Sequence, residues 1–138
     1  MCRLFGFRSI IQSQVHRSLI SCENSLIEQS EEHSDGWGLA YFTQGVPHLV
    51  KNANTAIEDQ LFQKVSGIVS SETVLAHLRR ATVGELSMVN SHPFQYGHWV
   101  FAHNGEIPDF DGYRDEFLDR VKPHLRRFIL GTTDSEVI

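Results

Sequence analysis

The sequence is poor in the features that mark several classes of protein. It has only two cysteines, Cys2 and Cys22, among 138 residues, which is too few for a disulfide scaffold. Its apolar runs, such as 39–42 and 67–69, fall far short of the ~20 residues that a membrane-spanning helix needs, and the N-terminus lacks the apolar stretch of a signal peptide. These absences predict a cytoplasmic protein with two free thiols.

An excess of positive charge is also missing. Twelve Lys and Arg residues face seventeen Asp and Glu residues, and the formal net charge of −5 argues against binding to nucleic acid. None of the eight histidines stands in HxH, HExxH or a comparable ligand spacing. We therefore expect no metal, no cofactor, no nucleic-acid partner and no membrane partner.

The remaining composition is that of a globular protein. Hydrophobic residues make up 41% and charged residues 21% of the chain, with ten glycines and four prolines, which is unlike a disordered protein or a coiled coil. The length suits one domain over 1–138, because a chain of about 150 residues can bury close to 70% of its unfolded surface.

Hydrophobic patterns predict a mixture of strands and helices. Apolar and β-branched runs indicate strands over 2–11, 36–42, 46–50, 73–78 and 98–103, and Gln44-Gly45 indicates a hairpin between the second and the third. Wider spacings indicate helices over 17–32, 56–65 and 110–121. At the end of the chain, Thr133 and Glu136 have the spacing of a capping box. The chain thus stops where a helix is expected to begin, which predicts a domain that is incomplete at its C-terminus.

Cys2 is the sharpest candidate for chemistry. Removal of Met1, which is usual before a small residue, places a thiol and a free α-amino group on one residue. Because the pKa of an α-amino group is near 7.7–8.0, it can act as the base for its own side chain. The alternative is a small residue packed in a terminal strand.

Arg79 and Thr82 follow the strand predicted at 73–78 and form a candidate site for a carboxylate. A guanidinium binds a carboxylate through two parallel hydrogen bonds, and the Thr82 hydroxyl can support it. A surface ion pair is the alternative use of Arg79.

Two further polar positions complete the candidate set. The Asn104 side chain and the Gly105 N–H can form an oxyanion hole, although Asn-Gly is also a common hairpin turn. Asp134 can hold an ammonium group, or it can lie in the first turn of a helix, where the helix dipole favours an acid.

Taken in order, several motifs resemble the class II glutamine amidotransferase domain of the N-terminal-nucleophile hydrolases. They are Cys2, HLRRATVG at 77–84, NSHPF at 90–94, HNG at 103–105 and GTTDSE at 131–136. DGWG at 35–38 and NSHPF make the chain more similar to the stand-alone branch, which includes γ-glutamyl amide hydrolases. The resemblance implies an α+β fold, a four-layer αββα sandwich with two antiparallel sheets.

The resemblance also implies roles for the candidate residues. Cys2 would attack the γ-carboxamide of glutamine or a γ-glutamyl amide, and Asn104 and Gly105 would stabilise the oxyanion. Arg79 with Thr82 would hold the α-carboxylate, and Asp134 the α-amino group. The products would be glutamate and ammonia or an amine, and a synthase partner could accept the ammonia.

Some features depart from the family pattern or have no assigned role. Residues 32–35 read Glu-His-Ser-Asp where the domains fused to synthases carry Arg-Gly-Tyr-Asp, and Arg80 stands where those domains have an aromatic residue. His33, His92 and His103 receive no role from the sequence. Uncovered sheet edges predict a homo-oligomer. The alternative to an enzyme is a non-catalytic regulatory or assembly module that retains the glutamine pocket.

Overall fold

A four-stranded antiparallel sheet organises the chain, which a computed structural model describes over residues 1–138. Its strands are β1 (Arg3–Gln14), β2 (Trp37–Thr43), β3 (Val46–Asn52) and β4 (Ser70–Leu78). Their order in the sheet is β1-β4-β2-β3, so the first strand pairs with the last. This pairing brings the beginning of the chain to the residues that follow β4.

The β2–β3 hairpin confirms the hairpin predicted from the sequence. Thr43 pairs with Val46, so the loop contains only Gln44 and Gly45, which have φ angles of 51° and 79°. Positive φ at both central positions is the geometry of the two-residue turns that match the twist of paired strands, and glycine adopts it without strain.

One face of this sheet packs on short helical segments. They are η1 (Arg17–Ser21), α1 (Leu26–Gln29) and α2 (Gln60–Ile68). The buried core between them and the sheet consists mainly of Val15, Leu19, Trp37, Leu39, Phe62, Val74, Ala76 and Leu78. Burial of these side chains supplies the main stabilisation, because each fully buried large apolar side chain contributes about 1.5–3 kcal/mol.

Two of the predicted helices differ from the structure. The helix predicted over 17–32 is wrong in extent, because Asn24 has φ 60° and a continuous right-handed helix cannot pass through that conformation. The helix predicted over 56–65 begins only at Gln60. Asp59 caps it by accepting a hydrogen bond from the Leu61 N–H at 2.8 Å and also accepts one from Trp37 Nε1 at 2.9 Å.

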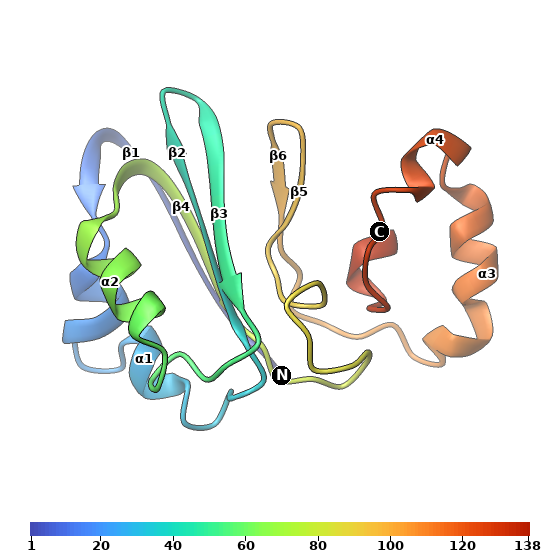
Figure 1. The fold of residues 1–138 in the computed structure, drawn as a ribbon, viewed down its shortest axis with the longest axis horizontal. Coiled ribbons are helices and arrows are strands. Elements are labelled where there is room, and N and C mark those ends of the chain that lie inside the picture. The colour runs from blue at the N-terminus through green and yellow to red at the C-terminus, as the bar shows by residue number, and fades with distance from the viewer.

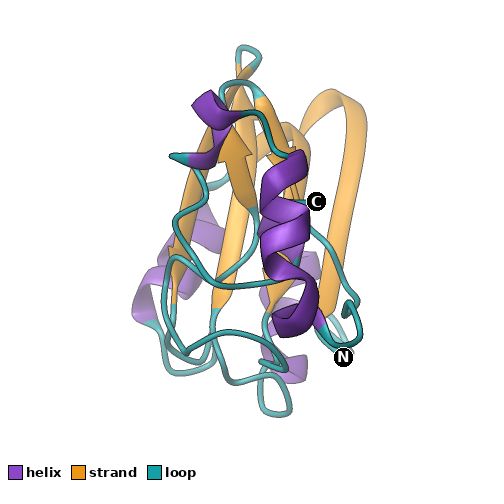
Figure 2. Ribbon diagram, turned by 90° about the vertical axis from the view of Figure 1, so that its right-hand side faces the viewer, coloured by secondary structure: helices purple, strands orange, loops and turns teal.

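The other face of the sheet is covered by a second antiparallel sheet and by helices. Figure 1 shows, from left to right, the helices α1 and α2, the four-stranded sheet, the β5–β6 pair, and the C-terminal helices. These later elements are β5 (Phe94–Tyr96), β6 (Trp99–Phe101), α3 (Phe110–Arg120), α4 (Pro123–Arg126) and η2 (Ser135–Val137). Figure 2 shows α3 lying in front of the strands. The prediction of an α+β fold with two antiparallel sheets is confirmed.

The segment that enters β5 lies directly on the first sheet. A side chain at Gly38 would overlap the carbonyl group of His92, so glycine allows this close approach. Lys51 on β3 donates a hydrogen bond from Nζ to the Ser91 carbonyl at 2.8 Å, and its Nζ lies 5.2 Å from the ring centroid of Phe94. These contacts fix the NSHPF segment against the sheet.

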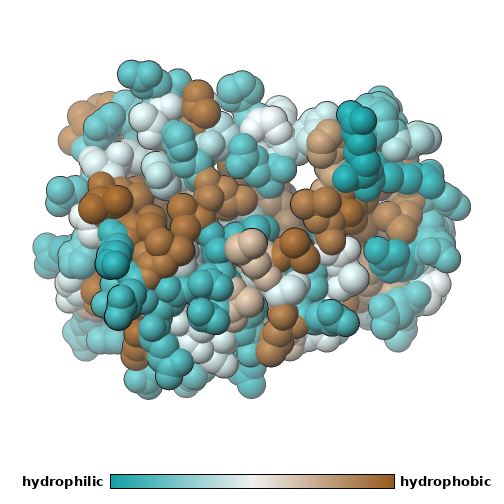
Figure 3. Space-filling view, viewed as in Figure 1, coloured by the Kyte–Doolittle hydropathy of each residue, from teal (hydrophilic) through white to brown (hydrophobic).

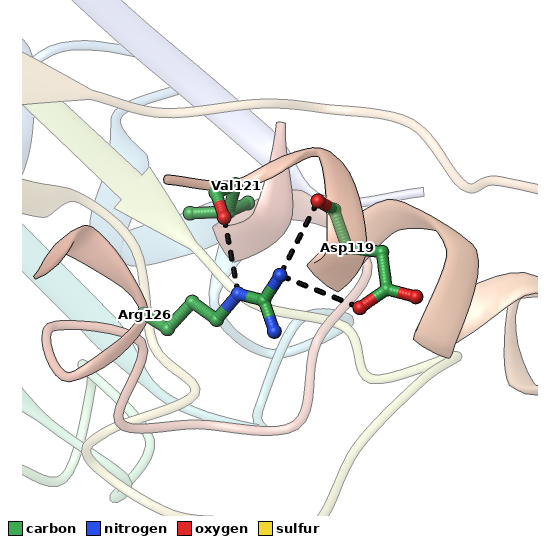
Figure 4. A network of polar contacts seen from close by, with 3 residues as sticks. All are labelled: Asp119, Val121 and Arg126. Carbon is green, nitrogen blue, oxygen red and sulfur yellow. Dashed lines mark hydrogen bonds and ion pairs between the residues drawn. The ribbon is translucent and has the colours of Figure 1, made fainter. Parts of the chain in front are cut away.

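The C-terminal helices are joined by a corner that Arg126 stabilises. Its Nε donates to the Val121 carbonyl at 3.0 Å, and its Nη2 lies 3.3 Å from Asp119 Oδ1 (Figure 4). The capping box predicted at Thr133 and Glu136 is wrong. Asp134 is the N-cap of η2, and the Glu136 carboxylate instead accepts hydrogen bonds from the N–H groups of residues 130 and 131.

An apolar groove of about 700 Å³ separates β3 and the β5–β6 pair from the C-terminal segment. Its walls include Leu49, Tyr96, Trp99, Phe101 and Phe128. Figure 3, drawn in the view of Figure 1, shows hydrophobic surface, in brown, across the middle of the molecule. No helix in the structure combines the length and apolar character needed to cross a membrane.

Candidate active site

Cys2 lies at the point where β1 begins and β4 ends. Arg3 pairs with Leu78, so antiparallel pairing carries Cys2 past the end of β4 to Arg80. The Cys2 Sγ accepts a hydrogen bond from the Arg80 N–H at 3.3 Å and lies 3.4 Å from the Arg80 carbonyl oxygen. The thiol is half-buried, and it therefore lies against a polar peptide group at the sheet edge rather than in the apolar core.

Arg79 is buried, with 3% of its surface exposed, and its guanidinium donates hydrogen bonds to the carbonyl oxygens of residues 83–85 at 2.8–3.1 Å. It forms no ion pair, so the alternative of a surface ion pair is wrong. Burial lowers the pKa of Arg79, and the nearby Asp35 and Cys2 oppose this shift. A buried cation thus lies close to the thiol. Thr82 is exposed and has no side-chain hydrogen bond.

Asp35 holds the segment beside Cys2, a role that the sequence did not predict. Its N–H donates to the Arg79 carbonyl at 3.1 Å, and its Oδ2 accepts from the Ala81 N–H at 2.8 Å. These two bonds bracket the Arg80 peptide group that contacts the Cys2 thiol. Only the fold could reveal this contact, because Asp35 and Ala81 are 46 residues apart.

Asn104 reaches Cys2 from the far end of the second sheet. Its Nδ2 donates to the Cys2 carbonyl oxygen at 2.9 Å, which places a side-chain amide and the exposed Gly105 beside the candidate nucleophile. The hairpin alternative for Asn104-Gly105 is wrong, because β6 ends at Phe101 and the next element is a helix. A side chain at Gly105 would overlap the His103 ring.

Asp134 provides a buried negative charge, with 4% of its surface exposed. Its Oδ2 accepts from the Ile107 N–H at 2.7 Å, and its Oδ1 accepts from the N–H and hydroxyl groups of Ser135 at 2.8 and 3.2 Å. The first contact ties Asp134 to the segment that carries Asn104. Because an ionised carboxylate has about four acceptor positions, it retains capacity for a ligand ammonium group.

Buried histidines lie behind these residues. The rings of His77 and His92 are 4.4 Å apart between centroids, and none of their four nitrogens has a hydrogen-bond partner. Burial lowers the pKa of His77 to about 3 and that of His92 to about 4, so both rings are neutral at pH 7. His103 lies 3.1 Å from the Ser135 hydroxyl through Nδ1. No group of three or more potential ligands is arranged to hold a metal ion.

His33 and Asn90 are buried polar residues that sequence reasoning left without a role. His33 Nδ1 lies 2.8 Å from the Gln29 carbonyl oxygen and its Nε2 lies 2.8 Å from the Met1 carbonyl oxygen, so the ring is held beside the N-terminus. Asn90 lies between residues 83–85 and residues 131–133 and makes hydrogen bonds to both segments. The NSHPF motif includes Asn90, but its spacing gives no indication of which loops the side chain joins.

The geometry combines a thiol with groups of opposite charge. Cys2 and Asn104 are directly linked, Arg79 contributes a buried cation, and Asp134 a buried anion. A ligand that carries both a carboxylate and an ammonium group would compensate both buried charges. The arrangement therefore suits nucleophilic chemistry on an α-amino acid derivative.

Comparisons with known proteins agree with the predicted resemblance. The family described as "Glutamine amidotransferases class-II" matches residues 1–138. A Saccharomyces cerevisiae protein named "Probable glutamine amidotransferase DUG3" is 32% identical over 99% of the chain and 43% of its own length. A Mycobacterium tuberculosis protein named "Gamma-glutamyl-hercynylcysteine sulfoxide hydrolase" is 36% identical over 54% of the chain and 33% of its own length.

A solved structure shares the fold. It is that of a glutamine aminotransferase class-II domain protein from Silicibacter pomeroyi, and it matches 99% of the chain with a TM-score of 0.71 and 22% identity. The match covers 51% of that protein. The chain thus spans about half or less of the length of these three proteins.

Proposed function

Because the chain belongs to the class-II glutamine amidotransferases, we propose that it cleaves the γ-carboxamide of glutamine or of another γ-glutamyl amide through a thioester on Cys2. The observation that carries this proposal is the link between Cys2 and Asn104, which are 102 residues apart and joined by a 2.9 Å hydrogen bond. It brings the only cysteine at the sheet edge together with an amide donor of the kind that stabilises an oxyanion.

The reaction begins after removal of Met1, whose surface is 82% exposed. The Cys2 amino group takes the thiol proton, and the sulfur attacks the γ-carbonyl carbon to form a tetrahedral oxyanion. Asn104 and the Gly105 N–H stabilise this anion. The ammonium group then returns the proton to the leaving nitrogen, the carbon–nitrogen bond breaks, and a γ-glutamyl thioester remains.

Hydrolysis of the thioester completes the cycle. The Cys2 amino group takes a proton from water, and the resulting hydroxide attacks the thioester carbonyl. The carbon–sulfur bond breaks, the sulfur regains the proton, and glutamate leaves. No external oxidant or cofactor enters this sequence.

Substrate recognition rests on the two buried charges. Arg79 holds the α-carboxylate, to which the free Thr82 hydroxyl can add a hydrogen bond, and Asp134 holds the α-ammonium group. Both contacts lie on the amino-acid head, so the leaving amine can vary in size. The name of the mycobacterial relative describes hydrolysis of a substituted γ-glutamyl compound, which supports including such amides among the candidate substrates.

The finer architecture and the partners belong to the same proposal. We place residues 1–138 in an N-terminal-nucleophile amidotransferase domain with a four-layer αββα sandwich, and the order of layers in Figure 1 supports this arrangement. Ammonia released at Cys2 could pass to a synthase partner.

Covalent labelling tests the proposal. Untagged protein is incubated with 6-diazo-5-oxo-norleucine, a glutamine analogue that alkylates nucleophiles, and its intact mass is measured before and after. We expect loss of Met1 and one adduct, which peptide mapping locates on Cys2. Ammonia release from glutamine is measured in parallel.

Two cysteine variants provide the control. Cys2→Ala should abolish labelling and ammonia release, whereas Cys22→Ala should change neither, because the Cys22 thiol lies on the helical side, 3.8 Å from the Ser18 carbonyl oxygen. A processed chain that binds no analogue and hydrolyses neither glutamine nor γ-glutamyl amides overturns the proposal and favours a non-catalytic module.

A further inference from the structure

Asn90 forms a bridge between two loops that carry opposite charges. Its Nδ2 donates to the Glu85 carbonyl oxygen at 3.0 Å and to the Thr132 hydroxyl at 3.1 Å, and its Oδ1 accepts from the Thr132 N–H at 2.8 Å. Asn90 is 2% exposed, and together these bonds fix its amide in one orientation.

The bridge continues directly to the two charged residues. Arg79 Nη1 donates to the same Glu85 carbonyl oxygen at 2.8 Å, so Arg79 and Asn90 share one acceptor. On the other side, Thr132 lies two residues before Asp134. One peptide carbonyl and one side-chain amide therefore connect the buried cation to the segment that holds the buried anion.

Glycines allow the two loops to approach Asn90 this closely. A side chain at Gly131 would overlap the Asn90 Oδ1, and a side chain at Gly84 would lie about 3.0 Å from the Asn90 Nδ2. Gly84 also has φ 79°, a conformation that residues with a side chain rarely adopt. Glycine at positions 84 and 131 thus leaves the space that the Asn90 amide occupies.

From these contacts we propose that Asn90 is a positioning residue that sets the spacing between Arg79 and Asp134. It thereby selects ligands that carry a carboxylate and an ammonium group on one carbon. This inference rests on the proposed function, in which Arg79 and Asp134 bind the two ends of an α-amino acid. Asn90 itself touches neither the thiol nor the scissile amide, so its role is in recognition rather than in bond cleavage.

The test replaces Asn90 with aspartate, which has the same shape but cannot donate from the atom that faces Glu85. A carboxylate oxygen beside the Glu85 carbonyl repels it, and the two loops move apart. For Asn90→Asp we expect about a tenfold rise in KM for glutamine and a kcat within about twofold of the wild type, since the loss falls on binding.

Competitive ligands separate positioning from a general structural effect. Glutamate carries both α groups, whereas glutarate lacks the α-ammonium group and does not depend on the spacing. We expect the inhibition constant of glutamate to rise about tenfold in Asn90→Asp and that of glutarate to change less than about twofold. Thr132 lies at an exposed position on the other side of the bridge, and Thr132→Val should also raise the inhibition constant of glutamate, by a smaller factor.

The controls decide between folding and function. Gln63 on α2 also donates a hydrogen bond from a side-chain amide to a loop carbonyl, that of Ile57, at 3.3 Å. Because this contact lies far from the Asn90 bridge, Gln63→Ala should leave the inhibition constants of glutamate and glutarate unchanged. Alkylation of Cys2 by iodoacetamide, which needs no head-group contacts, should proceed at the wild-type rate in every variant. If Asn90→Asp does not fold, Thr132→Val alone carries the test.

Each outcome has one meaning. A wild type without turnover refutes the proposed function, and the inference falls with it. If the wild type turns over, two results in the folded variants refute the role of Asn90 alone. One is an unchanged KM for glutamine, and the other is an equal rise in the inhibition constants of glutamate and glutarate.

Discussion

His33 Nε2 lies 2.8 Å from the carbonyl oxygen of Met1. Its Nδ1 also faces a carbonyl, that of Gln29, and a neutral imidazole can donate only one of these two hydrogen bonds. Removal of Met1 takes its carbonyl group away and leaves an amino group on Cys2. With Nδ1–H donating to Gln29, we expect Nε2 to accept a hydrogen bond from that amine once Met1 is removed.

The first prediction follows from this contact. His33→Phe should lower kcat for glutamine hydrolysis by about 10- to 100-fold, because the amine that serves as the base is no longer held in one orientation. Initial rates of the processed protein measure the effect, and intact mass confirms that Met1 is absent. His16→Ala, at an exposed position, is the control. Wild-type kcat in a folded, processed His33→Phe would contradict the prediction.

The second prediction concerns the oxyanion contact. Asn104→Ala should reduce kcat by about 10²- to 10³-fold, with a smaller change in KM, since its amide acts on charge that develops during the reaction. Steady-state kinetics with glutamine checks this split. A fall in kcat/KM of the same size that came entirely from a higher KM would assign Asn104 to substrate binding instead.

Local patterns located the four strands of the first sheet, because apolar runs and turn residues are close in sequence, but they did not give the order β1-β4-β2-β3. The β2–β3 hairpin depends on Gln44-Gly45 and on the apolar residues beside it, and α3 was predicted within one residue of its observed end. The segment 17–32 has a helical spacing of apolar residues, but tertiary packing divides it at Asn24. Propensity therefore located most of the longer elements and packing decided their extent, but the short β5 and α4 were not predicted.

The site shows the same division between local and distant determinants. Cys2, Arg79, Asn104 and Asp134 were identified from motifs and from the ends of strands. Asp35 and Asn90 were not assigned a function, because Ala81 and Thr132, which they contact, lie 46 and 42 residues away in the sequence. Such positioning residues become visible only when the loops are placed in space.

The third prediction is a loss of stability in acid. The ordinary histidine pKa is 6.5, and burial lowers it to about 3 in His77 and about 4 in His92. Between pH 6.5 and about 4 the unfolded chain binds protons that the folded chain does not, so stability is full above this window and falls as the pH falls through it. Melting temperatures at pH 7, 6, 5 and 4 measure the decline, at about 2–8 °C for each kcal/mol lost.

Variants identify the histidines responsible for the dependence of the melting temperature on pH. His92→Phe removes one buried titrating ring and should make the dependence on pH shallower, whereas His98→Phe, at an exposed position, should leave it unchanged. A melting temperature that stays constant from pH 7 to pH 4 would show that the two buried rings do not control acid stability.

The last prediction concerns the apolar groove beside β6. Trp99 is 80% exposed and Leu130 71% exposed along it, and contiguous exposed apolar surface favours association between chains. The 138-residue chain should therefore self-associate as its concentration rises and should enhance the fluorescence of an apolar dye, as sedimentation velocity and dye titration measure. Trp99→Lys should weaken both effects, whereas Ile10→Lys, at a position 98% exposed on β1 and outside the groove, should alter them less. A chain that remains monomeric at high concentration and binds no dye would show that the groove walls close on one another in solution.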